Sequence, residues 1–80
     1  MTENIIRLNQ CESGDNVVIE SLSIQGVMRR RLLDLGFVKG AQIEVLQKSP
    51  LGDPAAYRVN HTTIALRKEE SSQIFVKEAT

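Results

Sequence analysis

The sequence predicts a mainly β protein, a small and partly open barrel of about five strands with one inserted α-helix. Its 80 residues leave room for one small domain with a thin core, so a deep substrate cavity is not expected. Glycine and proline separate short runs rich in β-branched residues, which is typical of strands joined by turns. Helical periodicity is confined to one stretch. We therefore expect residues 1–80 to form a single domain.

The first predicted strand covers residues 17–22 and follows a turn at residues 12–15. Its sequence, VVIESL, has the β-branched content of a strand. Strand alternation directs Val17, Ile19 and Leu22 toward the core.

The predicted helix follows directly and covers residues 23–35, with Ser23 as its N-cap and Gly36 just after its end. The apolar residues of this stretch recur at helical spacing and form one inward stripe. They are Ile24, Val27, Met28, Leu32 and Leu35.

Gly40 opens the next predicted strand, residues 41–47. Ile43 and Val45 alternate there with polar side chains, as in a half-buried strand. The segment PLGDP at residues 50–54 ends this strand, because two prolines around Gly and Asp leave little capacity for ladder hydrogen bonds. We expect a rigid turn or loop.

A hairpin is predicted after the loop, with strands at residues 56–59 and 62–67 around a tight turn at Asn60 and His61. Asn supplies one of the positive φ angles that such a turn requires. The remaining segments are a polar or single helical turn at residues 68–72 and a last strand at residues 73–77. Short strands with one helix in so short a chain suggest a barrel of the SH3-like or OB kind.

The three consecutive arginines of the helix do not form one basic patch, because successive helical residues point about 100° apart. Arg31 falls within the apolar arc of the helix, while Arg29 and Arg30 flank its outer face. We predict that Arg31 reaches inward to a partner such as Asp53 or a loop carbonyl. Leu33 falls on the opposite face, as an isolated surface leucine or as part of a partner-binding patch.

The composition argues against several functions. Ten basic and ten acidic residues cancel, which removes the electrostatic case for nucleic-acid binding. No glycine pattern matches a phosphate-binding loop, and no nucleophile motif accompanies the single histidine. No apolar run approaches the length of a bilayer span, so we expect a cytoplasmic protein without direct membrane insertion.

Cys11 and His61 are weak candidates for a metal site, because no further ligands stand at the spacing of a known ligand motif. The simpler interpretation is a surface thiol and a turn imidazole. Phe37 and Phe75 lie in core-like contexts, which leaves Tyr57 as a weak stacking platform for RNA. We expect no cofactor, with a bound Fe(II) or Zn(II) ion as the alternative.

Three segments together resemble the FeoA-like family. They are RLLDLGFVKGA at residues 31–41, SPLGDP at residues 49–54 and IALRKEE at residues 64–70. The resemblance implies an SH3-like β-barrel with a helical insertion and an accessory role in ferrous iron uptake. It also implies a partner, the FeoB-type transporter, which is a membrane protein with a cytosolic GTP-binding domain. His61 departs from the family pattern and is not treated as a family feature.

The resemblance makes a non-enzymatic cytosolic adaptor our leading hypothesis, held at the inner face of the membrane through the transporter. The candidate partner-binding residues are Leu51, Gly52, Asp53, Pro54, Leu33, Arg29 and Arg30. Short rigid loops serve both binding and structure, so the loop alternatively only fixes a barrel corner. The residues assigned a structural role are Arg31, Gly36, Gly40 and Arg67.

Two other functions remain as alternatives. A GTPase-activating partner would supply Arg29 or Arg30 to the transporter as an arginine finger. A metal-responsive domain would bind Fe(II) or Zn(II) through Cys11, His61 and carboxylates. The open edge strands of a small barrel would also allow homo-oligomers to form by strand pairing.

Overall fold

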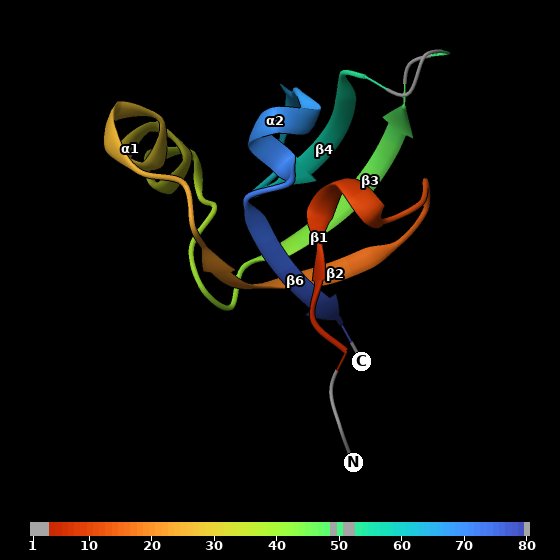
Figure 1. The fold of residues 1–80 in the computed structure, drawn as a ribbon. Coiled ribbons are helices and arrows are strands. Elements are labelled where there is room, and N and C mark those ends of the chain that lie inside the picture. The colour runs from red at the N-terminus through yellow and green to blue at the C-terminus, as the bar shows by residue number, and fades with distance from the viewer. Residues whose placement is uncertain (1–3, 49, 51–52, 80) are drawn as a thin grey trace.

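The protein folds into one curved antiparallel sheet that carries two α-helices among the described residues (Figure 1). The structure is a computed structural model and describes residues 4–48, 50 and 53–79. The strands are β1 (Ile6–Arg7), β2 (Asn16–Leu22), β3 (Gln42–Lys48), β4 (Ala55–Val59), β5 (Thr62–Leu66) and β6 (Ile74–Glu78). The helical elements are a 3₁₀ turn, η1 (Leu8–Gln10), and the helices α1 (Gly26–Leu35) and α2 (Lys68–Ser71).

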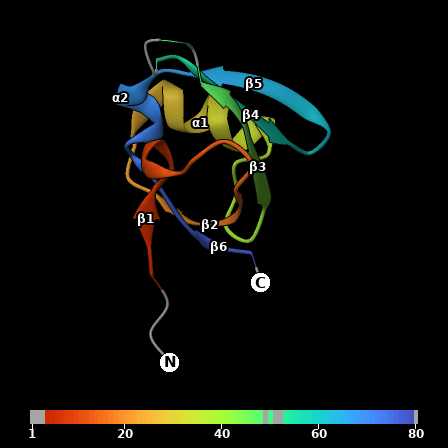
Figure 2. The same cartoon turned by 90° about the vertical axis from the view of Figure 1, so that its right-hand side faces the viewer.

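The sheet has the strand order β1-β6-β2-β3-β4-β5, with every neighbouring pair antiparallel. The predicted mainly β architecture is therefore confirmed. One strand was not predicted: β1 pairs with β6, with Ile6 opposite Val76. Its two residues are too few to show an alternating pattern. Figure 2 shows β1 and β5 at opposite sides of the sheet, where they form its two edges.

Two irregularities bend the long strands. The register of β2 against β6 shifts between Ile19 and Ser21, and that of β3 against β4 shifts between Val45 and Gln47. Such bulges increase the local twist and allow a sheet to curl around its own core. The inward side chains of all the long strands therefore meet in one apolar interior.

The core consists of apolar side chains that alternate along the strands, together with a few from the connections. Its members are Leu8, Cys11, Val17, Ile19, Ile24, Leu32, Phe37, Ile43, Val45, Ala55, Tyr57, Val59, Leu66, Ile74 and Val76. The inward directions expected for Val17, Ile19, Ile43 and Val45 are confirmed. The expectation that Tyr57 is a surface platform is wrong, because its ring is fully buried.

Helix α1 begins later than predicted. Ser23 is not its N-cap, because the Ser23 N–H donates to the Gln73 carbonyl at 2.9 Å and so extends the pairing of β2 with β6. The helix starts at Gly26, with Gln25 in the N-cap position. It ends as predicted, since Gly36 adopts a left-handed conformation and its N–H donates back to the last turn.

The buried face of α1 also differs from the prediction. Leu32 is its one fully buried residue, and Leu33 is half-buried rather than exposed. Val27, expected to face inward, is 86% exposed. The predicted stripe began at Ile24, which is buried but precedes the helix, so it does not define which helical face is inward. Figure 1 shows α1 at one side of the curved sheet, and its side chains Met28, Leu32 and Leu35 pack on the core.

Candidate interaction site

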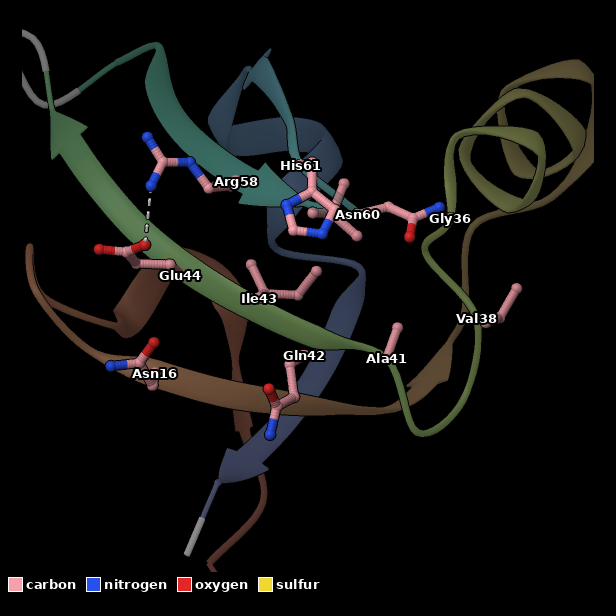
Figure 3. Close-up of a pocket in the computed structure, with 11 residues that line it drawn as sticks. Asn16, Gly36, Val38, Ala41, Gln42, Ile43, Glu44, Arg58, Asn60 and His61 are labelled. Carbon is pink, nitrogen blue, oxygen red and sulfur yellow. Dashed lines mark hydrogen bonds and ion pairs between the residues drawn. The ribbon is translucent and has the colours of Figure 1, made fainter.

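A groove of about 520 Å³ lies between the C-terminal end of α1, strand β3 and the turn that joins β4 to β5 (Figure 3). Its lining residues come from four separate parts of the chain. They are Asn16, Gly36, Val38, Ala41, Gln42, Ile43, Glu44, Arg58, Val59, Asn60 and His61.

Backbone conformations that few residues adopt build one end of this groove. Asn60 and His61 have φ angles of 54° and 66°, so the predicted tight turn is confirmed and uses two consecutive left-handed residues. Gly36 has a φ of 110° and lies against the turn: a Cβ atom there would be 3.4 Å from the Cβ of Asn60. The turn and the end of α1 therefore form one continuous wall.

The groove has an apolar floor and a polar rim. Figure 3 shows Ala41 and Ile43 on the β3 side, facing the Asn60–His61 turn. Val38 adds an apolar side chain that is 44% exposed. A groove with an apolar floor and a charged rim has the composition of a protein interface.

A charged pair stands on the rim of the groove. Arg58 of β4 lies opposite Glu44 of β3, and Nη1 of the arginine is 3.3 Å from Oε1 of the carboxylate. Both side chains are about half exposed, so solvent screens the pair and it contributes no more than about 1 kcal/mol. The charges are therefore available to a partner at little cost to the fold.

The arginines of α1 are arranged differently from the prediction. Arg31 was expected to reach inward but lies on the exposed face of the helix. Arg29, expected on the outer face, is half-buried, and its Nη1 donates to the carbonyls of Leu22 at 3.0 Å and Ile24 at 3.5 Å. Arg29 thus joins α1 to the end of β2. Arg30 is exposed, as predicted.

The proline-rich loop is only partly described. Leu51 and Gly52 lie outside the described residues, so their role as binding residues stays a prediction. Asp53 and Pro54 are exposed, and Oδ1 of Asp53 accepts a hydrogen bond from the Lys68 N–H at 2.8 Å. The loop is thereby joined to the start of α2, rather than to α1 through Arg31 as expected.

The other residues assigned a structural role act mainly through their backbones. Gly40 has a φ of 91°, and its N–H donates to the carbonyl of Ile19 at 2.8 Å. The Arg67 side chain is exposed, but its N–H donates to Oε1 of Glu70 at 2.9 Å and so closes the first turn of α2. Gly40 therefore fixes the entry to β3, and Arg67 the start of α2.

Cys11 is not the surface thiol that was expected. It is 1% exposed, and its Sγ donates weakly to the Arg7 carbonyl at 3.9 Å. Burial, with a smaller contribution from the negative charge of Asp15, raises the pKa of Cys11. A thiol of this kind is a poor nucleophile and a poor metal ligand at neutral pH, because both roles require the thiolate.

His61 is exposed in its turn, as expected. No group of three or more His, Cys, Asp or Glu side chains in the described part of the chain is arranged to hold a metal ion. A site built from His61 and Cys11 therefore stays a prediction. Among residues 4–48, 50 and 53–79, no helix has the length and apolar character of a bilayer span.

The sequence prediction missed Val38, Glu44 and Arg58 as site residues. They become neighbours of the groove only after β3, β4 and the connection before β3 have assembled. The one local signal was the Asn60–His61 pair, which marked the turn at the edge of the groove.

Comparison with known proteins places these features in a family. The sequence model of the FeoA domain matches residues 6–78. Over 72 residues the chain is 40% identical to the Fe(2+) transport protein A/Fe(2+) transporter FeoB fusion protein of Porphyromonas gingivalis. That match includes 90% of this chain but only 8% of the fusion protein, so the chain spans a small part of its relative.

Solved structures agree with this assignment. The FeoA protein of Chlorobium tepidum is 35% identical, with a TM-score of 0.89 over 94% of this chain and 71% of its own. The FeoA protein of Stenotrophomonas maltophilia, complexed with zinc, is 32% identical, with a TM-score of 0.79 over 89% of this chain and 88% of its own. The latter is described as an SH3 domain protein, so the expected SH3-like fold is confirmed.

The same fold occurs beyond ferrous iron transport. A manganese-dependent transcriptional repressor is 19% identical, with a TM-score of 0.86 over 99% of this chain and 44% of its own. Identity at this level shows a shared fold alone. The fold therefore does not identify the function, and the family match carries that part of the assignment.

Proposed function

Because the chain belongs to the FeoA domain family, we propose that it is a non-enzymatic accessory protein of ferrous iron transport that docks on an FeoB-type transporter and modulates it. The transporter's cytosolic part is the proposed contact, which would hold this protein at the inner face of the membrane. The observation that carries the proposal is the Porphyromonas gingivalis relative, in which the two proteins form one chain.

A fusion supports association because it keeps two domains at high effective concentration without any further affinity. Where the domains are separate chains, their interface must supply the affinity that the linkage supplied. We therefore look for a surface on this chain that is shaped for a protein segment.

The groove of Figure 3 is the surface that we assign to this contact. It combines an apolar centre, with Val38 and Ala41 accessible beside the buried Ile43, and a polar rim at Glu44 and Arg58. Protein interfaces have this composition, with an apolar centre that excludes water and a rim that stays hydrated. The proline-rich loop remains the second candidate surface, since its residues Asp53 and Pro54 are exposed.

A role without catalysis fits the titratable groups. Catalytic sites usually shift pKa values toward the reactive form of a group. Burial raises the pKa of both Cys11 and Tyr57 and so favours their unreactive protonated forms. The groove itself contains one imidazole and one ion pair, with no nucleophile beside them.

A metal-responsive role is the second candidate, favoured by the zinc complex of the Stenotrophomonas maltophilia relative. Of the candidate ligands, His61 is exposed to solvent and Cys11 is buried. His61 could therefore bind an ion at the surface, whereas an ion at Cys11 would have to reach a buried thiol. A metal-dependent complex with the transporter would be the form of this role that is compatible with docking.

The test is a binding measurement between the purified chain and the cytosolic region of its host's FeoB-type transporter, with and without a GTP analogue and Fe(II). Val38→Asp places a carboxylate on the exposed apolar wall of the groove and is expected to weaken binding at least tenfold, or about 1.4 kcal/mol. Val27→Asp is the matched control, because it makes the same change at an exposed valine of α1.

The outcomes of this experiment distinguish docking at the groove from docking at the proline-rich loop. Loss of binding in Val38→Asp with unchanged binding in Val27→Asp supports docking at the groove. If Leu51→Ala weakens binding and Val38→Asp does not, the contact lies at the proline-rich loop. Absence of binding by the unmodified chain under every condition would contradict docking on the cytosolic region.

A further inference from the structure

A second hollow, separate from the groove, lies where η1, α2, the end of β3 and the start of β4 meet. It has a volume of about 270 Å³. Its walls come from these elements and from the end of β5. The lining residues are Asn9, Lys48, Asp53, Ala55, Tyr57, Leu66, Lys68 and Ser71. Figure 1 shows α2 next to β4, and η1 packs against α2. We call this hollow the α2 cavity.

Two buried polar atoms of the α2 cavity have no hydrogen-bond partner. They are Oη of Tyr57 and Oδ1 of Asn9. The Tyr57 side chain is 0% exposed and lines this hollow. Buried polar groups without partners are rare in folded proteins, because each one forfeits the hydrogen bonds it made to water in the unfolded chain. Both atoms line one hollow, so a molecule bound there would complete their hydrogen bonds.

The Tyr57 hydroxyl is a proton donor at neutral pH. Burial raises the pKa of Tyr57, and the neighbouring Ser71 hydroxyl opposes this rise only in part. Ser71 lies close by but forms no hydrogen bond with Oη of Tyr57, and its own Oγ donates to the carbonyls of Arg67 at 3.3 Å and Lys68 at 3.5 Å. Tyr57 therefore offers an O–H to the cavity, whereas Asn9 offers an acceptor.

The charges around the α2 cavity favour an anion. Lys48 and Lys68 supply two ammonium groups, and Asp53 supplies one carboxylate. The Asp53 carboxylate is already engaged, since its Oδ1 accepts from the Lys68 N–H at 2.8 Å. Ala55 and Leu66 are buried and apolar and would contact a small hydrocarbon group.

We propose that the α2 cavity binds a small carboxylate that carries an N–H donor on the adjacent carbon, the group shared by free amino acids and the C-termini of peptides. Lys48, Lys68 and the Tyr57 hydroxyl would bind the carboxylate, and Oδ1 of Asn9 would accept the N–H. A volume of about 270 Å³ suits a ligand of one small residue, being just below the usual range for larger organic ligands. Lys68 is exposed, and its side chain would move aside to admit the ligand.

The proposal is independent of docking on the transporter and is tested by NMR titration of the ¹⁵N-labelled chain with three probes. L-alanine represents a free amino acid and N-acetyl-L-alanine represents a peptide C-terminus. N-acetyl-L-alaninamide has the same shape as the latter without the negative charge. We expect saturable shifts of the backbone signals of Asn9, Tyr57 and Ser71 with one or both carboxylates and none with the amide. The effective probe identifies the source of the carboxylate.

Three variants connect the binding to the cavity. Tyr57→Phe removes only the hydroxyl, and Lys68→Gln removes one charge at similar length; each is expected to weaken binding at least tenfold. Lys39→Gln, on the exposed connection before β3, is the matched control and is expected to bind normally. Absence of saturable shifts, equal binding of the amide, or unchanged binding by both cavity variants would overturn the proposal. So would a lower melting temperature of Tyr57→Phe, since it would reveal a structural partner for the hydroxyl.

Discussion

Replacing Gly36 by alanine tests whether a single backbone conformation joins α1 to the wall of the groove. Gly36 has a φ of 110°, which side chains with a Cβ atom rarely adopt. Its N–H closes the last turn of α1, and the following residue, Phe37, is fully buried. The chain therefore cannot relax at this position without moving either the helix or a core side chain.

The magnitude follows from the local geometry. An added Cβ would lie 3.4 Å from the Cβ of Asn60 and 3.5 Å from Cγ2 of Val59, which are van der Waals contacts rather than overlaps. The cost is therefore in the backbone, at about 1–2 kcal/mol for an L-residue in the left-handed region. Alanine also restricts the unfolded chain, which offsets about 0.4–1 kcal/mol. We expect the free energy of unfolding of Gly36→Ala to fall by about 1 kcal/mol.

Urea unfolding measures this change. With a slope near 1 kcal/mol per molar for a chain of this size, the midpoint should fall by about 1 M, and the melting temperature by about 4–8 °C. Gly26→Ala is the matched control. Gly26 has a φ of 75°, closer to the left-handed minimum, and no atom lies within contact distance of an added Cβ. Gly26→Ala should therefore lower the free energy of unfolding by less than Gly36→Ala. A Gly36→Ala protein as stable as the original, or one less affected than Gly26→Ala, would refute the reasoning.

Two further predictions concern side chains that the structure places differently from the sequence prediction. Arg29→Gln should lower the free energy of unfolding by about 1 kcal/mol, because it removes the guanidinium hydrogen bonds to the Leu22 and Ile24 carbonyls. Arg30→Gln, at an exposed position, is the control and should change the free energy of unfolding little. Equal effects of the two substitutions in urea unfolding would contradict the role of Arg29. Burial raises the pKa of Cys11 from about 9, so the folded protein holds that proton more tightly than the unfolded chain. The contribution of the Cys11 thiol to the free energy of unfolding is complete below pH 9 and decreases as the pH rises above 9. A Cys11→Ala protein should therefore lose less stability over that interval. A parallel decrease in both proteins would assign the effect to other groups.

The strands were predicted well because their signals are local. Alternation located β2 and β3, and the Asn60–His61 pair located the hairpin of β4 and β5. The end of α1 was predicted for the same reason, since a glycine after a helical stretch closes it without side-chain strain. Its beginning was not, because Ser23 satisfies its N–H across the sheet rather than within a helix turn.

The orientation of α1 required information that is not in the helix. The predicted stripe put Val27 and Leu32 on one inward face, but Leu32 is buried and Val27 is exposed. The packing of α1, including the contact of Arg29 with the end of β2, exists only once the sheet has formed. Arg31 and Val27 are exposed, rather than inward as predicted.

Tyr57 shows how far a local pattern determines a site. Ala55, Tyr57 and Val59 alternate along β4, and this alternation alone indicates that the tyrosine ring is buried. A buried tyrosine normally finds a partner for its hydroxyl. Whether the Tyr57 hydroxyl finds a partner depends on η1 and α2, which come from opposite ends of the chain and line the same hollow. They place Asn9 and Ser71 near the hydroxyl, but neither side chain forms a hydrogen bond with it. The burial of the ring is therefore readable from the strand, whereas the unmet hydrogen bond that indicates a ligand is visible only in the assembled fold.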